Sequence, residues 1–242
     1  MTYQFETVVY TKEDRIARIT LNRPRVLNAF NMQMRDDMYQ VLEAVRDDTE
    51  VRCIVLNGEG ERAFCTGADL TEFGTAPSRV IARQVRWERD VWGLFLSIDK
   101  PIIAALHGYV IGSGVEMALL CDFRIASEDV SFGLPEAALG MLPAAGGTQS
   151  LPRVVGSSEA VNMLLSNRRI DANMALDIGL VHRVVARDVL LKESLALAQR
   201  LASRPARAIS AIKRSVHRGI DMPLAEALEL ELYMAATTMS YK

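Results

Sequence analysis

The chain has 242 residues, of which 50% are hydrophobic and 24% charged, as is typical of a globular protein with a large buried core. Its net charge is −2 and it has no basic block, so nucleic acid is not an expected partner. The 3 cysteines are widely spaced and fit neither a disulfide framework nor a zinc site. We therefore expect no bound metal, and free thiols in a reducing, cytoplasmic compartment.

Membrane insertion is not expected either. The longest apolar run, from Pro101 to Leu120, is interrupted by His107, Glu116 and several glycines. Such a run favours a strand, a turn and a helix over a membrane span. The N-terminal residues lack the basic and apolar regions of a signal peptide.

The first part of the chain alternates strand and helix patterns. Thr7–Tyr10 and Ile16–Leu21 are β-branched runs that predict a hairpin, and Asn31 is positioned to cap a helix that ends near Asp47. Further elements are predicted in chain order: a strand at Cys53–Leu56, a helix at Arg79–Ser97, a strand at Ile102–Leu106, a helix from Val115 and a strand at Phe123–Ala126. Buried strands between helices indicate an α/β layer fold.

After about residue 157 the pattern is mainly helical. Asp171 is expected to cap a helix that Gly179 ends, and a short strand-like run follows at Leu180–Val185. Three more helices are predicted at Asp188–Ser203, Pro205–Arg218 and Pro223–Met239. We divide the chain into an α/β core, residues 1–185, and a C-terminal helical region, residues 186–242, and find no internal repeat in the sequence.

Two glutamates, Glu116 and Glu136, stand inside apolar segments punctuated by glycine. A carboxylate in such surroundings needs a partner or a raised pKa. If the two converge on one pocket, their proton affinities are pushed apart, so that one serves as an acid and the other as a base. The alternative interpretation is that both are surface charges that flank buried segments.

Two glycine-containing turns are candidates for ligand contact. They lie around Gly67-Ala68 and at Gly112-Ser113-Gly114, each after a predicted strand. Backbone N–H groups at such turns can face one oxygen and form an oxyanion hole, although each turn is also compatible with an ordinary entry into a helix. The second turn lacks the third glycine of a dinucleotide fingerprint, and Ser113 has no His/Asp series typical of a hydrolase triad.

Taken together, these segments resemble the enoyl-CoA hydratase (crotonase) family. The most specific similarities are Phe64–Leu70, the stretch Gly108–Asp122, Phe132–Glu136 and Gly146–Gln149, in this order. The resemblance implies a spiral core of ββα units and a C-terminal helical trimerisation region, in a homotrimer or a dimer of trimers. It also implies an acyl-CoA thioester substrate with no cofactor, since coenzyme A is part of the substrate.

The resemblance also implies roles for particular residues. Ala68 and Ser113 match the two backbone N–H donors of the oxyanion hole, although glycine is usual where this chain has Ser113. The coenzyme A contacts match the following residues: Arg25, Val26, Leu27, Ala68, Asp69 and Leu70. The family often has a lysine where this chain has Thr71, and it usually adds a helix beyond Tyr241-Lys242 that closes the acyl pocket.

The two glutamates discriminate between reactions within this family. Family hydratases carry both carboxylates, whereas isomerases typically keep only a later one. Dienoyl isomerases and hydroxyacyl-CoA hydrolases use an aspartate where this chain has Ala144. We therefore predict a 2-enoyl-CoA hydratase with Glu116 and Glu136 as catalytic residues. The alternatives are an enoyl-CoA isomerase, a C–C bond hydrolase on the same scaffold, or a non-catalytic acyl-CoA-binding protein.

Overall fold

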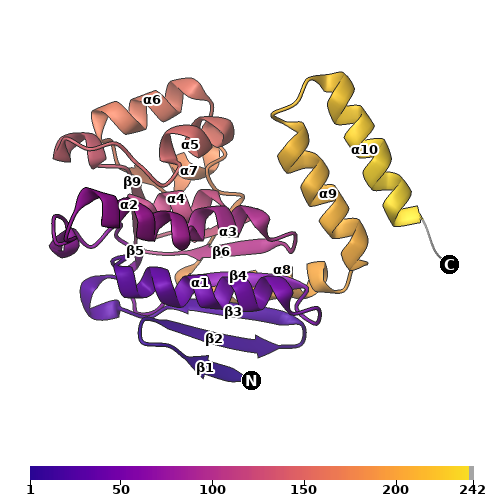
Figure 1. Ribbon diagram of the computed structural model, residues 1–242, viewed down its shortest axis with the longest axis horizontal. Coiled ribbons are helices and arrows are strands. Elements are labelled where there is room, and N and C mark those ends of the chain that lie inside the picture. The colour runs from indigo at the N-terminus through magenta and orange to yellow at the C-terminus, as the bar shows by residue number, and fades with distance from the viewer. Residues whose placement is uncertain (240–242) are drawn as a thin grey trace.

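A computed structural model describes residues 1–239 of the chain, apart from the side chains of Arg79, Ala82 and Arg86. Its strands form two sheets (Figure 1). The larger sheet has the order β1 (Thr2–Gln4), β2 (Val8–Glu13), β3 (Ile16–Leu21), β4 (Cys53–Gly58), β6 (Ile102–Leu106), β8 (Phe123–Ser127) and β11 (Arg183–Val185). The smaller sheet has the order β10 (Ile170–Asp171), β9 (Ser131–Gly133), β7 (Tyr109–Ile111) and β5 (Ala63–Cys65).

The predicted N-terminal hairpin is confirmed: β3 has the predicted bounds, and β2 continues beyond Tyr10 to Glu13. β2 and β3 pair antiparallel from Val8↔Leu21 to Glu13↔Ile16, and the two turn residues Asp14 and Arg15 have φ of 44° and 67°. Two consecutive positive φ values give a tight turn whose twist matches that of the flanking strands. From β3 onward the larger sheet is parallel.

The chain winds as a spiral in which each turn gives one strand to each sheet. β4 and β5, β6 and β7, and β8 and β9 are three such successive pairs, and their members are neighbours within the two sheets. The helices and short 3-10 helices of this part are η1 (Pro24–Val26), α1 (Met32–Asp47), η2 (Leu70–Glu72), α2 (Arg79–Glu88), α3 (Val91–Ser97), α4 (Ser113–Leu119), η3 (Glu136–Leu139), α5 (Gly147–Val155), α6 (Ser157–Ser166) and α7 (Ala172–Asp177). The repeat is structural, and the sequence showed no corresponding periodicity.

Helix α1 begins where the sequence predicted. The side chain of Asn31 accepts a hydrogen bond from Met34 N at 2.9 Å, which satisfies one of the unpaired donors of the first turn. The buried face of the helix carries Met34, Met38 and Val41, which join the main core. Spacings of three and four residues keep these side chains on one side of the helix.

The single helix predicted at Arg79–Ser97 is wrong, because two helices occupy this segment. α2 ends at Glu88, and Asp90 leaves the helical conformation with ψ of 84°. Its carboxylate then accepts a hydrogen bond from Gly93 N at 3.0 Å and caps α3. An aspartate that competes for backbone donors in this way favours a helix start over a helix interior.

The C-terminal helices divide into one that belongs to the core and two that project from it. η4 (Arg187–Val189) leads into α8 (Leu190–Ala202), which buries Leu190 and Ala198 against β4, β6 and β8. α9 (Ala206–Gly219) and α10 (Leu224–Met239) form a hairpin that stands away from the body (Figure 1). Within residues 1–239 no helix is long and apolar enough to cross a membrane.

Charged side chains attach the α9–α10 hairpin to the core. Asp122, at the end of the α4–β8 connection, accepts hydrogen bonds from Ile102 N at 2.7 Å, Lys213 Nζ at 2.7 Å and His217 Nε2 at 3.1 Å. Burial raises the pKa of Asp122, but the hydrogen bonds from His217 and Lys213 outweigh that effect and hold its pKa below the ordinary value. A second, more exposed ion pair joins Arg214 to Asp99.

We predict that Asp122→Asn destabilises the protein by roughly 3 kcal/mol at neutral pH, since it leaves Lys213 without its carboxylate in a nearly buried site. The control Asp99→Asn removes a more exposed ion pair and should cost less than about 1 kcal/mol. The pKa of Asp122 is lower in the folded state than in the unfolded chain. Its contribution to the free energy of unfolding is therefore complete above about pH 3.9 and is lost as the pH falls through the folded-state pKa. Urea unfolding at neutral and acidic pH measures both effects; an Asp122→Asn cost that does not shrink in acid would contradict this account.

Candidate active site

Two turns at the ends of neighbouring strands approach each other closely. The turn after β5 contains Gly67 with φ of 93°, and the turn after β7 contains Gly112 with φ of 53°. A Cβ on Gly67 would lie 3.1 Å from the carbonyl oxygen of Ile111 and 3.5 Å from Ser113 N. The two backbones therefore need glycine here both for the dihedral angle and for the short separation.

The amides of Ala68 and Ser113 are available to a ligand. On either side of Ala68 the chain pairs with Phe30, through Phe30 N to Gly67 O at 2.7 Å and Asp69 N to Phe30 O at 2.9 Å. The hydrogen bonds of residues 1–239 include none that Ala68 N or Ser113 N donates. Because Ser113 is the first residue of α4, its N–H has no acceptor within the helix.

Glu116 lies in the first turn of α4 and is buried. Its Oε1 accepts hydrogen bonds from Ala145 N and Gly147 N, each at 2.8 Å. The Gly146-Gly147 segment makes this contact possible, since a Cβ on Gly147 would lie 3.1 Å from Oε1. Two backbone donors stabilise the ionised carboxylate and fix its orientation.

Glu136 is the first residue of η3 and has a different environment. Its Oε2 is buried and has no hydrogen-bond partner, and a Cβ on Gly112 would lie 2.7 Å from its Oε1. Burial raises the pKa of Glu136, and the negative charge of Glu116 raises it further. A desolvated carboxyl group with a negative charge nearby favours the protonated form, so this pair is suited to hold one proton.

Both glutamates and both amides line one cavity of about 410 Å³. The rest of its wall is mostly apolar and includes Phe30, Leu70, Phe73, Trp92, Leu139, Met141, Leu142 and Ala144. Phe30 and Trp92 pack against each other with ring centroids 5.6 Å apart. The expectation that the two glutamates converge on one pocket is therefore confirmed, and the surface-charge alternative is wrong.

The residues predicted to contact coenzyme A lie on two neighbouring segments. Arg25 and Val26 are exposed on η1, and Leu27 follows in the left-handed region with φ of 56°. Leu27 O accepts hydrogen bonds from Thr66 N and Thr66 Oγ1, each at 3.2 Å, which ties this loop to the Gly67 turn. The loop borders the site. Arg25, Val26 and Leu27 nevertheless line neither this cavity nor a second cavity that adjoins it.

Asp69 is part of the scaffold of this loop. Arg23 Nη1 lies 2.9 Å from Asp69 Oδ2 and also donates to Ala29 O at 2.6 Å. Hydrogen bonds from Thr71 and Arg23 hold the pKa of Asp69 below its ordinary value. Thr71, which stands where a lysine is common in similar sequences, is therefore occupied with the carboxylate that precedes it.

Sequence reasoning did not identify several residues on which the site depends. The amides of Ala145 and Gly147 orient Glu116, although the Gly146-Gly147 pair was visible as a motif. Buried Asn28 holds the η1 loop by accepting from Arg23 N at 2.8 Å and donating to Glu59 O and Ala63 O at 3.0 Å. An internal asparagine flanked by apolar residues was the available signal for this role.

Several known proteins that resemble this chain in sequence and fold are named as enoyl-CoA hydratases. Residues 11–242 match the family model described as enoyl-CoA hydratase/isomerase. This chain belongs to the enoyl-CoA hydratase/isomerase family. It is 40% identical to a probable enoyl-CoA hydratase of Rhizobium meliloti over 94% of this chain and 87% of that protein.

Two further relatives support the assignment. A crotonyl-CoA hydratase of Syntrophomonas wolfei is 36% identical over 94% of this chain and 87% of its own length. The crystal structure of an enoyl-CoA hydratase subunit of Geobacillus kaustophilus superposes with a TM-score of 0.92 at 36% identity, over 99% of this chain and 92% of that one. The predicted fold class, an α/β crotonase-like spiral with C-terminal helices, is confirmed.

We predict that Glu116→Gln lowers the pKa of Glu136, because the substitution removes the neighbouring negative charge. Burial is the larger cause of the raised pKa and remains, so the pKa should stay above that of a free glutamate. Carboxyl ¹³C NMR titration measures the change. Glu128→Gln, on an exposed turn after β8, is the control and should leave the Glu136 titration where it was. An unchanged Glu136 pKa in Glu116→Gln would show that the two carboxylates do not interact.

Proposed function

We propose that this protein adds water across the C2=C3 double bond of a 2-enoyl-CoA thioester to give a 3-hydroxyacyl-CoA. The observation that carries the proposal is the pair of carboxylates in one cavity, one held by two backbone donors and the other with a buried oxygen that has no hydrogen bond and with a raised pKa. The same cavity presents two unpaired amide donors, and the hydratase names of the relatives agree with this chemistry.

The amides of Ala68 and Ser113 bind the thioester oxygen. Negative charge grows on this oxygen as water adds at C3, because the thioester becomes an enolate. Donors that are fixed before the reaction stabilise this charge without reorganisation, and the loss of one such donor costs roughly 3–4 kcal/mol. The glycine-dependent approach of the two turns keeps both donors at one cavity wall.

The two carboxylates move the protons. Glu116 is oriented by Ala145 N and Gly147 N and accepts a proton from the attacking water, whose oxygen bonds to C3. Glu136, whose pKa burial and the charge of Glu116 raise, holds the proton of the pair in this proposal and donates it to C2, so one proton enters and one leaves the pair. Each transfer by a positioned group contributes about 10²–10⁴-fold to the rate.

The alternatives fit the site less well. Ala144 lines the cavity beside the glutamates, at the position where dienoyl isomerases and hydroxyacyl-CoA hydrolases of the family use an aspartate. A shift of the double bond needs a single group to carry a proton between carbons, and simple acyl-CoA binding needs neither buried carboxylate. Absorbance of the conjugated enoyl thioester decides: it falls with crotonyl-CoA for a hydratase and rises with a 3-enoyl-CoA for an isomerase.

The proposed substrate brings its own coenzyme A, which the η1 loop at Arg25, Val26 and Leu27 and the Asp69-Leu70 strip are placed to contact. Because the reaction only moves protons and water, the proposal includes no metal or redox cofactor. We also propose a cytoplasmic location. It is supported by three free cysteines, all buried, for which burial raises the thiol pKa to about 12.

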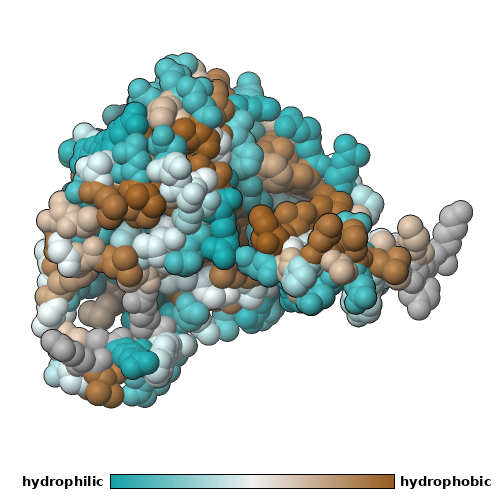
Figure 2. All heavy atoms as spheres, turned by 90° about the horizontal axis from the view of Figure 1, so that it is seen from above, coloured by the Kyte–Doolittle hydropathy of each residue, from teal (hydrophilic) through white to brown (hydrophobic). Residues whose placement is uncertain are grey.

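We propose that the α9–α10 hairpin joins copies of the chain into a homotrimer or a dimer of trimers. Its exposed apolar side chains recur every four residues, as Ile212 and Val216 on α9, Ile220 directly after α9, and Leu224, Leu228 and Leu232 on α10. Figure 2 shows brown, apolar surface along this projecting part. An apolar face of this kind on a soluble protein is expected to be covered by a partner.

Replacement of either catalytic glutamate tests the proposed function. We predict that Glu116→Gln and Glu136→Gln each lower kcat for crotonyl-CoA by at least about 100-fold, since each removes one proton transfer. Crotonyl-CoA affinity, measured by calorimetry on the inactive variants, should stay nearly unchanged. A variant that turns over at a near-normal rate would remove its residue from the proposed mechanism.

Ser113 separates the hydratase from a covalent hydrolase. Only the backbone N–H of Ser113 is used in the proposal, so Ser113→Gly should keep activity within about tenfold. Ser113→Pro removes the donor and should cost roughly 3–4 kcal/mol in transition-state stabilisation. An acyl-enzyme detected by mass spectrometry after incubation with substrate would instead identify Ser113 as a nucleophile.

The oligomer is tested on the α9–α10 face. We predict a mass of three or six chains by light scattering at micromolar concentration, and dissociation by Leu228→Glu, which places a charge on the apolar face. The control Glu229→Gln changes a neighbouring residue of α10 without adding a charge. A monomeric wild-type chain would refute this part of the proposal.

A further inference from the structure

A second cavity of about 460 Å³ adjoins the catalytic one. The two cavities share Phe30, Ala68, Phe73 and Trp92 as wall residues, so a mainly aromatic wall lies between them. The second cavity runs between the start of α1 and the segment formed by residues 73–92. A part of a ligand that extends from the catalytic cavity past this wall therefore enters the second cavity.

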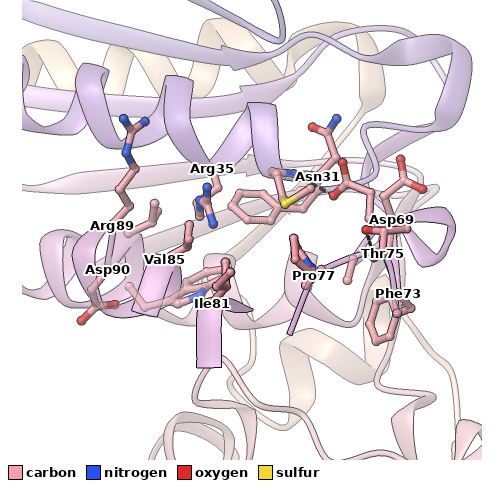
Figure 3. A pocket seen from close by; sticks show the side chains of 18 residues that line it. Asn31, Arg35, Asp69, Phe73, Thr75, Pro77, Ile81, Val85, Arg89 and Asp90 are labelled. Atoms are coloured by element: carbon pink, nitrogen blue, oxygen red, sulfur yellow. Dashed lines mark hydrogen bonds between the residues drawn. The ribbon is translucent and has the colours of Figure 1, made fainter. Parts of the chain in front are cut away.

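The middle of the second cavity is apolar. Met32, Pro77, Ile81 and Val85 line it from both sides, and Figure 3 shows Ile81, Val85 and Pro77 from the segment opposite α1. Such a wall favours methylene groups, because their burial removes apolar surface from water. The cavity is thus suited to the part of an acyl chain that lies beyond the reacting carbons.

Two arginines lie at one end of this cavity and share a single carboxylate. Arg35 donates to Asp36 Oδ1 through Nε at 2.9 Å and Nη2 at 2.7 Å, and Arg89 Nη1 lies 3.1 Å from Asp36 Oδ2. Both arginines line the cavity, whereas Asp36 does not. A guanidinium has five N–H donors, so this arrangement leaves donors and one net positive charge for a further anion.

The acidic residues of the cavity wall do not neutralise Arg35 and Arg89, because each of these acids binds another group. Asp69 pairs with Arg23 at 2.9 Å, and Glu72 accepts from Met32 N at 2.8 Å. Asp90 caps α3 through Gly93 N, and in Figure 3 its carboxylate points away from the Arg89 guanidinium. Among the described side chains, Asp36 is the one acid that forms a salt bridge with these two arginines.

We propose that Arg35 and Arg89 bind a terminal carboxylate on the substrate's acyl chain, so that the preferred substrate class is the carboxyl-terminated 2-enoyl-CoA. Planar guanidinium groups match a carboxylate geometrically and bind it through paired hydrogen bonds. The apolar middle of the cavity holds the methylene groups between the two ends. This inference rests on the proposed hydration, and it adds a specificity determinant remote from the reacting carbons.

Pairs of matched substrates test the carboxylate preference separately from the proposed hydration. Hydration rates are measured for crotonyl-CoA and for pairs of 2-enoyl-CoA thioesters of six, eight and ten carbons that end in either a methyl group or a carboxylate. We expect kcat/KM to favour the carboxylate member by at least tenfold for one chain length, and the preference to shrink as salt is raised. A preference for the methyl member at every length would overturn the inference and leave the hydratase proposal intact.

Substitutions of Arg35 and Arg89 test whether these two residues bind the carboxylate. Arg35→Met and Arg89→Met keep much of the side-chain volume but remove the charge, and each should lower the carboxylate-to-methyl ratio of kcat/KM at least tenfold. Arg35→Lys should keep part of the preference and checks that folding is retained. Crotonyl-CoA, whose short acyl chain ends in a methyl group, should be hydrated at the same rate within threefold. Arg183→Met, an exposed arginine outside both cavities, is the control for charge.

Binding provides a readout that does not need catalysis. Saturated adipyl-CoA and hexanoyl-CoA, with their eight- and ten-carbon counterparts, are titrated by calorimetry against wild type and Arg35→Met. Tighter binding of the carboxylate member that disappears in the variant supports the inference even if no substrate is hydrated. Equal weakening of both members, with crotonyl-CoA affected too, would assign the arginines to the coenzyme A phosphates and refute it.

Discussion

Close contact between two backbone turns is the constraint on which the active site depends. A Cβ on Gly114 would lie 2.4 Å from the carbonyl oxygen of Cys65, and a Cβ on Gly67 would lie 3.1 Å from that of Ile111. The turns can meet because they follow β5 and β7, which are neighbours in the smaller sheet. This contact brings Ala68 and Ser113 to one cavity wall, where their amides are placed for the proposed oxyanion site.

The two glutamates have different surroundings, as the proposed mechanism requires. Glu116 receives two backbone hydrogen bonds, which stabilise its charge, whereas a buried oxygen of Glu136 receives none. Burial and the charge of Glu116 raise the pKa of Glu136. Environments that separate two proton affinities in this way let one pair supply an acid and a base at the same pH.

Polar contacts also determine how the peripheral parts relate to this centre. Asp122 ties the α9–α10 hairpin to the core through Lys213 and His217, so the apolar face of the hairpin stays directed outward. On another side, Asp90 ends one helical run and starts the next, which shapes the wall of the second cavity. The Asp122 contact has no local sequence pattern, because it joins residues far apart in the chain, whereas the Asp90 cap is a local contact inside an otherwise helical pattern.

The sequence by itself determined the α/β class, the positions of most elements and the choice of Glu116 and Glu136 as candidate catalytic residues. The signals for these are hydrophobic periodicity, helix caps such as Asn31 and carboxylates in apolar segments, all of which are local properties of the chain. Only the tertiary structure decided that Ala145 N and Gly147 N orient Glu116, since these donors lie 29 and 31 residues along the chain. It also revealed the repeated spiral turns, whose similarity lies in strand pairing. Interactions between distant residues depend on how the sheets close, and residue type alone does not encode that closure.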